Sequence, residues 1–439
     1  MKIRLGLAAS VAALLWGNVA LAGAPVPDEQ ALTDLVQILH NEGVLDEAQF
    51  NQISAKAAKS EAKESWMDRL SLWGDLRGRY EGFYYVGDDS DVENRSRLRY
   101  RFRLNGKADI NDYASVLFRV ASGGDDNRST NQTLGNQADF ASDTIRIDRA
   151  YFRLSPFARG ELPDEAGSLW VEFGKVPNPY VWKEGKDFML WDHDINLEGI
   201  NILFEDDVTQ NVNLFANAGY YLLKEISDMA DPNLIAAQVG SHVRIGEDVE
   251  VGGRVSYFRF GNLDMAEIQH GVDGTGGVTS AGGNIVDGIT DGRTINVIEG
   301  GIYSNFDCFE DWPLTIYGNI STNLSSVRSS MFPQAGYENL AWGVGAQVGD
   351  KKKYALLGFG WFQIEANAFL SQFIDSDLFD GVTNRKGLVA YASRQILPNT
   401  DLTVTTFWSE PIDTSLPAFA DSVPKADRVR LQADLNFKF

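Results

Sequence analysis

The sequence has 439 residues, of which 44% are hydrophobic and 23% are charged, so the chain carries enough apolar side chains to form a folded core. Its formal net charge of −22 argues against a nucleic-acid partner, because a phosphate-binding surface needs an excess of Lys and Arg. One cysteine and four histidines leave little material for a disulfide, a metal site or acid–base catalysis. We therefore expect no enzyme activity, no cofactor and no metal.

The first 22 residues predict an export signal. Lys2 and Arg4 precede an apolar run over residues 5–15, and a small-x-small pattern places the expected cleavage after Ala22. The apolar run is shorter than the roughly 20 residues that a membrane-spanning helix needs. Residues 1–22 are therefore interpreted as a cleavable signal peptide.

Residues 23–65 are expected to form a periplasmic helical prefix, with its helices over residues 28–64. Apolar residues recur at helical spacing before residue 41, and residues 46–63 form a second segment rich in Ala, Lys and Glu. The apolar stripe of this second segment is thin. Two interpretations stay open, a solvated spacer and a self-associating or wall-contacting helix.

From residue 66 to residue 439 the dominant hydrophobic period is two, which is typical of β-strands. The predicted strands reach about 16 residues, whereas strands of globular proteins are nearer five or six. Short turns alternate with long loops, as in outer-membrane barrels. We therefore predict an all-β fold, a transmembrane antiparallel β-barrel of about 16 strands. Their expected centres are residues 78, 102, 117, 150, 171, 200, 216, 239, 255, 299, 319, 344, 362, 391, 405 and 433.

Two further features fit a barrel in lipid. An even number of strands closes the sheet, so that no unpaired edge meets the hydrocarbon. Amphipathic aromatic rings settle at the level of the lipid headgroups, and ten of them lie near predicted strand ends. These are Trp66, Trp73, Tyr84, Tyr85, Tyr113, Trp170, Tyr220, Tyr221, Trp312 and Trp408.

The second predicted strand carries an arginine at every other position. We call Arg95, Arg97, Arg99, Arg101 and Arg103 the arginine ladder, which Arg146, Arg149 and Arg153 of the fourth predicted strand extend. Because a charged side chain on the lipid face costs several kcal/mol near the midplane, the ladder is predicted to face a water-filled lumen. Two roles stay open, control of permeation and bracing of the wall through ion pairs with carboxylates.

The partner of the ladder is expected in the loop of residues 175–196. Its apolar residues are too numerous for a loop that floats in water, so we predict that it folds inward as a constriction loop. It would present charged groups to the arginines, namely Lys183, Glu184, Lys186, Asp187, Asp192 and Asp194. An ordinary capping loop is the alternative.

Three other patterns carry less weight. Asp192-His193-Asp194 suits a hydrolytic pair, but no second catalytic set accompanies it. Asp287 and Asp291, in the Gly-rich loop 261–292, lack the ligand spacing of an EF-hand calcium site. Cys308 is expected to be an inert, partly buried thiol.

Several stretches resemble the "putative porin" family of Gram-negative outer-membrane barrels, over most of residues 69–439. They are Asn94-Arg-Ser-Arg-Leu-Arg-Tyr-Arg, Asp148-Arg-Ala-Tyr-Phe-Arg-Leu, Gly174-Lys-Val-Pro-Asn-Pro, Trp191-Asp-His-Asp-Ile-Asn-Leu-Glu-Gly and Asp375-Ser-Asp-Leu-Phe. The end of the chain resembles the closing strand of such proteins, whose terminal aromatic residue, here Phe439, is read by the barrel-assembly machinery.

This resemblance implies a channel for passive diffusion of small hydrophilic solutes and ions. It also implies that the chain lies in the lipid of a Gram-negative outer membrane and assembles as a homotrimer. The alternative function is a barrel scaffold or adhesin with a periplasmic or cell-surface partner.

Overall fold

The structure is a computed structural model of the whole chain. It divides into two compact units, Met1–Leu70 and Ser71–Phe439. Within the part of the chain that the structure describes, no helix is long and apolar enough to span a membrane. The described residues are 37–41, 45–47, 49–51, 53, 67, 69–86, 93–124, 126–136, 140–155, 168–181, 190–227, 230–263, 282–307, 312–416 and 427–439.

In the first unit, residues 37–41 are helical and a second helical piece begins after Asp46. The backbone N–H of Gln49 donates to the Asp46 carboxylate at 2.7 Å, and the backbone N–H of Asp46 donates to the Gln49 side-chain oxygen at 3.1 Å. This reciprocal pair is a capping box, which satisfies two donors at the start of a helix. The ring of His40 stacks on Phe50 with 4.3 Å between centroids, which joins the two helical pieces.

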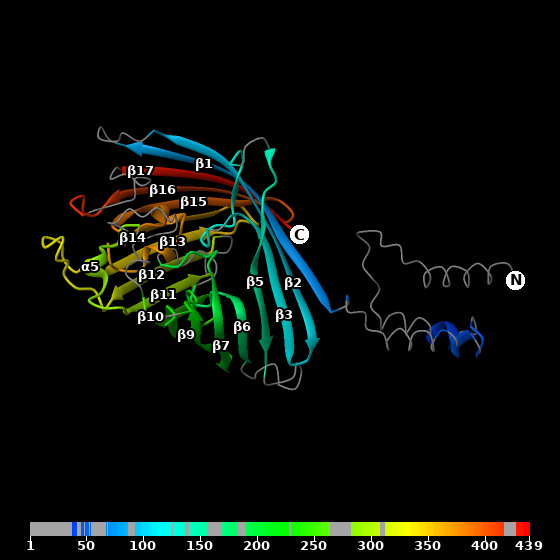
Figure 1. Ribbon diagram of the computed structural model, residues 1–439. Helices are drawn as coiled ribbons and strands as arrows, with labels where there is room; N and C mark the ends of the chain where they lie inside the picture. Colours follow the sequence, from blue (N-terminus) through cyan, green and yellow to red (C-terminus); the bar gives the residue numbers. More distant parts are fainter. Residues whose placement is uncertain are drawn as a thin grey trace. The chain divides into compact units, whose positions relative to one another are not determined.

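The second unit is a single antiparallel sheet that closes on itself (Figure 1). β1 pairs with both β2 and β17, so the ring has no free edge. All sixteen strand centres expected from the sequence lie inside its long strands, which confirms the predicted barrel. These strands are β1 (Leu70–Val86), β2 (Arg95–Asn111), β3 (Ala114–Ser122), β5 (Ile145–Leu154), β6 (Ser168–Pro177), β7 (Asn196–Thr209), β8 (Val212–Leu222), β9 (Asn233–Ile245), β10 (Val249–Gly261), β11 (Ile295–Phe306), β12 (Leu314–Asn323), β13 (Leu340–Gly349), β14 (Leu356–Ile364), β15 (Arg385–Leu397), β16 (Thr400–Pro411) and β17 (Asp427–Lys438).

One further strand, β4 (Gln132–Thr133), belongs to the loop between β3 and β5. β3 pairs only with the part of β2 from Arg103 onward, so the first half of β2 lacks this neighbour. β4 pairs with β2 at Arg99 and Tyr100 and so supplies part of the missing strand pairing. Two residues are too few to show an alternating pattern, which is why the sequence analysis did not predict this strand.

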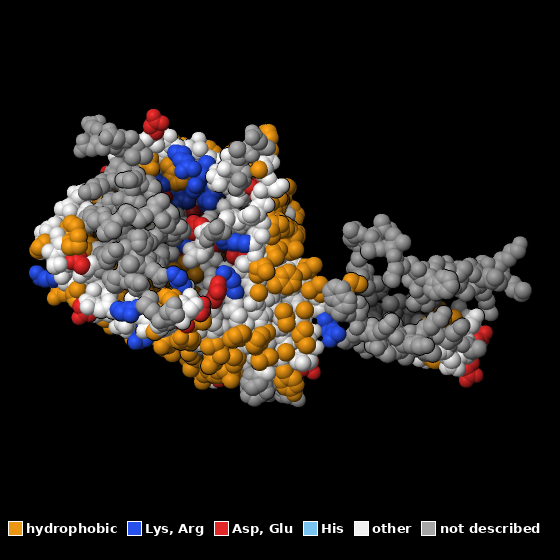
Figure 2. Space-filling model, viewed as in Figure 1, with side chains coloured by type: hydrophobic (Ala, Val, Ile, Leu, Met, Phe, Trp, Pro, Cys, Tyr) orange, Lys and Arg blue, Asp and Glu red, His pale blue; other side chains and the backbone are white. Residues whose placement is uncertain are grey.

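The two faces of each strand have different surroundings. On β1, Leu72, Leu76 and Tyr80 are exposed on the outer wall, while Asp75 and Glu81 are buried inside the barrel. Figure 2 shows the result as a broad band of hydrophobic side chains over the wall around β3 and β5. The apolar outer face is the one expected to contact lipid.

Two residues of the predicted aromatic girdles, Tyr85 and Tyr221, lie inside the barrel instead. The guanidinium of Arg428 lies over the ring of Tyr85, 5.5 Å from its centroid. Tyr221 is fully buried inside the barrel, where its hydroxyl donates to Asn201 at 2.9 Å. Its neighbour Tyr220 is exposed on the outer wall, because consecutive strand residues point to opposite faces. Other predicted girdle residues are exposed, namely Trp73, Tyr84, Tyr113 and Trp312.

The two ends of the barrel differ in their connections. Short turns, such as residues 112–113, 210–211 and 398–399, lie at the end where β1 begins and β17 ends. Outer-membrane barrels place short turns in the periplasm and long loops outside the cell. We therefore call the end with short turns the periplasmic end and the other the outer end.

Three outer-end connections contribute to a core inside the barrel. Their described parts are residues 190–195, residues 282–294 with α5 (Val286–Ile289), and residues 365–384 with η2 (Ser371–Phe373) and η3 (Leu378–Gly381). Trp191 is 2% exposed and packs against four aromatic rings of β10 and the third connection at centroid distances of 5.2–6.2 Å. We call residues 190–195 the first inward loop and residues 365–384 the second inward loop.

Candidate channel and its charged wall

Three cavities follow one another along the inside of the barrel. The outer cavity has a volume of about 260 Å³, the middle cavity about 690 Å³ and the periplasmic cavity about 270 Å³. Arg128 and Ser376 line both the outer and the middle cavity, and Pro313 and Gln347 line both the middle and the periplasmic cavity. The three cavities therefore adjoin, from the outer end to the periplasmic end.

Four residues of the arginine ladder lie on the inner face of β2 beside carboxylates of the neighbouring β1. Arg101 donates two hydrogen bonds to Asp75, at 2.7 and 3.1 Å, and Arg103 donates one at 2.8 Å. Arg97 pairs with Glu81, which also lies 3.7 Å from Arg99. These arginines therefore brace the wall between β1 and β2 while they face the interior.

Arg95, the first residue of the ladder, differs from the other four. It is exposed at the outer end of β2 and lines the outer cavity. Among the residues that the structure describes, no carboxylate forms an ion pair with it. Within the described part of the chain, its positive charge is therefore left uncompensated.

The predicted extension of the ladder lies on β5. Arg149 donates to Asn196 at 2.6 Å, and Arg153 donates to Glu172 at 2.6 and 2.9 Å. In a regular strand Arg146 and Arg149 would point to opposite faces, because they are three positions apart. A register shift at Asp148 changes which side chains of the strand point inward, so that both arginines donate to groups inside the barrel.

Of the six charged residues predicted for the constriction loop, Lys183, Glu184, Lys186 and Asp187 lie outside the described residues. Asp194 lies inside the barrel as predicted, with its carboxylate 3.4 Å from the guanidinium of Arg103. It also accepts hydrogen bonds from the backbone N–H and the hydroxyl of Thr130, at 3.1 and 2.9 Å. Burial acts to raise the pKa of Asp194, but the nearby arginines lower it well below its ordinary value.

Asp192 lines the middle cavity, and its hydrogen bonds join the first inward loop to the second. Its carboxylate accepts the backbone N–H groups of Asp194 and Ser376, at 2.8 and 2.7 Å, and its own N–H donates to the Phe373 carbonyl at 2.9 Å. Burial and the negative charges of Asp375 and Asp194 raise its pKa well above the ordinary value. Asp192 therefore ties the first inward loop to the second inward loop.

The sequence analysis missed the second inward loop as a source of carboxylates. Asp377 accepts hydrogen bonds from Arg79 at 3.0 and 3.1 Å and from Arg430 at 2.6 Å. Asp380 accepts from Arg428 at 2.6 Å and from Arg430 at 3.2 Å. Burial acts to raise the pKa of Asp377, but Arg79, Arg430 and Arg77 lower it well below its ordinary value. The available signal was a run of aspartates at short spacing in an otherwise apolar loop.

Glu81 of β1 connects both sets of arginines. Its side chain is completely buried, and it pairs with Arg97 of β2 and with Arg430 of β17. The side-chain amide of Gln432 donates to the same carboxylate at 3.0 Å. A completely buried carboxylate needs such partners, because an unpaired buried charge is strongly destabilising.

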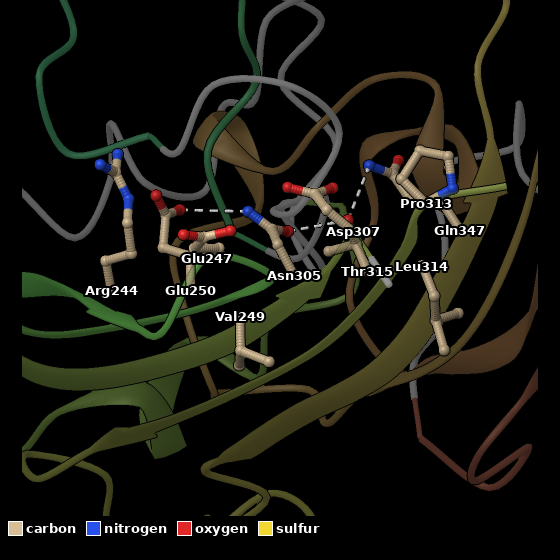
Figure 3. A pocket seen from close by; sticks show the side chains of 10 residues that line it. All are labelled: Arg244, Glu247, Val249, Glu250, Asn305, Asp307, Pro313, Leu314, Thr315 and Gln347. Atoms are coloured by element: carbon tan, nitrogen blue, oxygen red, sulfur yellow. Dashed lines mark hydrogen bonds between the residues drawn. The ribbon is translucent and has the colours of Figure 1, made fainter. Parts of the chain in front are cut away.

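The periplasmic cavity has the opposite charge balance (Figure 3). Glu247, Glu250 and Asp307 line it against a single basic residue, Arg244. The Asn305 amide donates to Glu250 at 3.1 Å. By comparison, six arginines and two carboxylates line the outer cavity, and five basic and six acidic side chains line the middle cavity. The interior therefore changes from positive at the outer end to negative at the periplasmic end.

The other residues considered in the sequence analysis are Asp287, His193 and Cys308. Asp287 accepts hydrogen bonds from the hydroxyls of Ser329 and Ser330, at 2.6 and 2.8 Å, and so joins two loops. His193 lines the middle cavity. No group of three or more His, Cys, Asp and Glu suited to a metal is present among the described residues, which exclude Cys308.

A model of the family described as "Putative porin" matches residues 89–275. The high-pH structure of Pseudomonas putida OprB has a similar fold, with a TM-score of 0.51 and 9% identity over 87% of this chain and 97% of that chain. The DcaP channel of Acinetobacter baumannii has a TM-score of 0.44 and 13% identity, over 84% of this chain and 97% of that chain. A mutant porin of Rh. blastica has a TM-score of 0.43 and 9% identity, over 84% of this chain and 100% of that chain. No curated protein matches the chain.

The closed sixteen-stranded barrel has the fold of an outer-membrane porin, and residues 89–275 match a porin family. Within this class, the family that its sequence matches is that of the putative porins, over the segment from β2 to β10. The resemblance seen in the sequence is thereby confirmed, and the fold and the family match both indicate a channel.

Proposed function

We propose that the constriction of this passive porin lies in the middle cavity, which arginines of the wall and carboxylates of the two inward loops line together. The observation that carries the proposal is the lining of that cavity, where Arg79 and Arg101 lie together with Asp194 and Asp377. Opposite charges on two sides of an aqueous passage create a transverse field, which orients dipolar solutes and limits the width of the opening. Small hydrophilic solutes and ions are the expected cargo.

In this proposal the arginine ladder sets the preference among ions. Arg95 contributes its full positive charge to the electrostatic potential of the lumen. The contribution of the other four residues of the ladder is reduced by their ion pairs, and they are Arg97, Arg99, Arg101 and Arg103. Arg149 and Arg153 continue the basic wall on β5. Lys183, Glu184, Lys186 and Asp187 belong to the same connection as Asp194, and in this proposal they are charged residues of the constriction loop.

Single-channel recording tests this function. The purified protein in planar lipid bilayers should give discrete, long-lived openings whose conductance rises with salt concentration. Heat-denatured protein is the control. A correctly folded barrel that inserts but stays silent would favour the alternative, a scaffold or adhesin whose interior is closed.

We further propose that the chain is exported through a signal peptide of residues 1–22 and assembles as a homotrimer. Phe439 supports recognition by the barrel-assembly machinery, since its ring is 61% exposed at the periplasmic end while its backbone pairs with Gly74. Deleting Phe439 should lower the amount of heat-modifiable barrel in isolated outer membranes. Cross-linking in those membranes should yield a trimer, and a monomer alone would contradict the assembly.

A further inference from the structure

We propose that the outer cavity is a binding site for small organic carboxylates that carry an apolar body. The site would retain such solutes above the constriction before they pass inward. This inference rests on the proposed channel function and adds a class of solute to it.

The charges of the outer cavity favour an anion. Six arginines line it, and they are Arg95, Arg97, Arg99, Arg128, Arg428 and Arg430. Their carboxylate partners number four, namely Asp126, Asp380, Glu81 and Asp377. Asp377 is also shared with Arg79 of the wall. Within the described part of the chain, these carboxylates leave at least two of the six positive charges uncompensated.

Two of the six arginines have the weakest carboxylate partners among the described residues. Arg95 has no ion pair among the described residues. Arg128 uses its guanidinium on the backbone carbonyls of Ser371 and Gly381, at 3.1 and 2.9 Å, and its nearest carboxylate, Asp126, is 3.9 Å away. A carboxylate held between two such guanidinium groups would gain charge-assisted hydrogen bonds, which are stronger than neutral ones.

The cavity also contains guanidinium donors that find no acceptor. The Nε groups of Arg99, Arg128 and Arg428 are buried without a hydrogen-bond partner among the described residues. Buried donors in proteins are normally paired, and an unpaired one marks a place where a water, an ion or a ligand completes the network. Three such donors around one cavity point to an occupant that accepts hydrogen bonds.

Aromatic rings give the cavity an apolar side. The Phe83 ring is flanked by the guanidinium groups of Arg428, Arg97 and Arg430, at 4.5, 5.1 and 5.3 Å from its centroid. Tyr85 lies 5.5 Å from Arg428. Stacking on a ring holds a planar guanidinium in a defined orientation and leaves its edge free to form bidentate hydrogen bonds.

Size narrows the class of solute. Pockets for drug-sized ligands occupy about 300–1,000 Å³, and the outer cavity, at about 260 Å³, is smaller. The arginines would recognise the carboxylate, and the two aromatic rings would cover the apolar body. Figure 2 shows basic side chains gathered in a hollow near the position of β1 and β17, so the surface is open to solution there.

Block of the ion current by benzoate tests the site. Benzoate added on the outer side of a bilayer with single channels in dilute KCl should reduce the current in a saturable way. Acetate and inorganic phosphate, at equal ionic strength, should block more weakly because they lack the apolar body. The double substitution Arg95→Gln with Arg99→Gln should raise the half-blocking concentration of benzoate about tenfold.

Lys386→Gln is the matched control, because it removes one positive charge at the same end of the barrel. Lys386 alternates with the buried Arg385 and lies on the outer face of β15, so benzoate block should stay unchanged. Equal block by phosphate and benzoate, or an unchanged half-blocking concentration in the double variant, would overturn the inference and leave the porin function intact. Absence of any conductance in the parent protein would overturn both.

Discussion

At the scale of single residues, the positive charges of the interior are bound to buried carboxylates. Arg101 and Arg103 share Asp75, and Arg97 and Arg430 share Glu81. An arginine in such a pair supports the wall and contributes to the field in the lumen at the same time. A substitution of such an arginine is therefore expected to change both the stability of the barrel and the ion selectivity of the channel.

Replacing Arg97, Arg99 and Arg101 together with Gln should shift permeability toward cations, because three positive charges leave the inner wall. The cation-to-anion permeability ratio should rise about twofold or more in dilute salt. The shift should shrink near 1 M salt, where the Debye length is roughly 3 Å. Reversal potentials in a KCl gradient measure the effect, with Lys386→Gln as the control. An unchanged potential in dilute salt would mean that these arginines brace the wall away from the ion path.

Arg254→Gln should destabilise the barrel. Arg254 donates to Glu299 at 2.8 Å, and both side chains are completely buried. Removing one partner of a buried ion pair leaves an unpaired charge and costs about 3–5 kcal/mol. The temperature at which the heat-modifiable gel band converts to the unfolded form should fall clearly.

Lys351→Gln is the control for that experiment. Its pair with Asp401 is one-third exposed on the lysine side, so its loss should cost less than about 1 kcal/mol. Equal conversion temperatures for the Arg254→Gln variant and this control would contradict the buried-pair argument.

At the scale of elements, the two inward loops are held together by a carboxyl group whose pKa is raised. Burial, Asp375 and Asp194 raise the pKa of Asp192, so it takes up a proton at a higher pH than an ordinary carboxyl group. Asp377 stays ionised there, because the arginines lower its pKa. Acidification should therefore remove negative charge from Asp192 and from Asp375, whose pKa burial and Asp377 also raise, before it affects Asp377.

This order of protonation predicts a pH-dependent selectivity. Lowering the pH through the range in which Asp192 takes up its proton should shift the reversal potential toward anions. Asp192→Asn should weaken this shift, because the residue can no longer change charge. Asp287→Asn, which removes a loop carboxyl group whose pKa is lowered by its serine partners, is the control. A full shift in the Asp192→Asn variant would exclude Asp192 as the titrating group.

The prefix should not be needed for conduction. The barrel closes through twelve paired positions between β1 and β17, none of which involves residues 28–64. Deleting residues 28–64 should therefore leave the conductance of a single channel unchanged within about 20%. A lost or much wider conductance would show that the prefix plugs or completes the pore.

At the scale of the whole molecule, the charge balance along the interior is asymmetric. The lining has an excess of arginines in the outer cavity and an excess of carboxylates in the periplasmic cavity. Fixed charges of opposite sign at the two ends of a narrow passage make entry of an ion depend on the side from which it arrives.

Current–voltage curves of single channels should consequently be asymmetric in dilute salt. The asymmetry should decline toward 1 M salt, as the fixed charges are screened. Glu247→Gln, which removes a negative charge from the periplasmic cavity, should reduce the asymmetry. Symmetric curves for the parent protein in dilute salt would contradict this prediction.

The sequence by itself determined the barrel and its strand count. These properties follow from side-chain alternation and loop length, which are local and repeat along the chain. The inward orientation of the arginine ladder followed from the same pattern, because five like charges on the lipid face are energetically excluded.

Only the tertiary structure decided which carboxylates meet those arginines. Asp377 reaches Arg79 across almost 300 positions of the chain, and Glu81 is joined to Arg430 by closure of the ring. The role of Asp192 as a tie between two loops and the correction at Tyr221 likewise depend on what lies across the barrel. No local pattern records such contacts, because they arise when loops pack against a wall whose strands are distant in sequence.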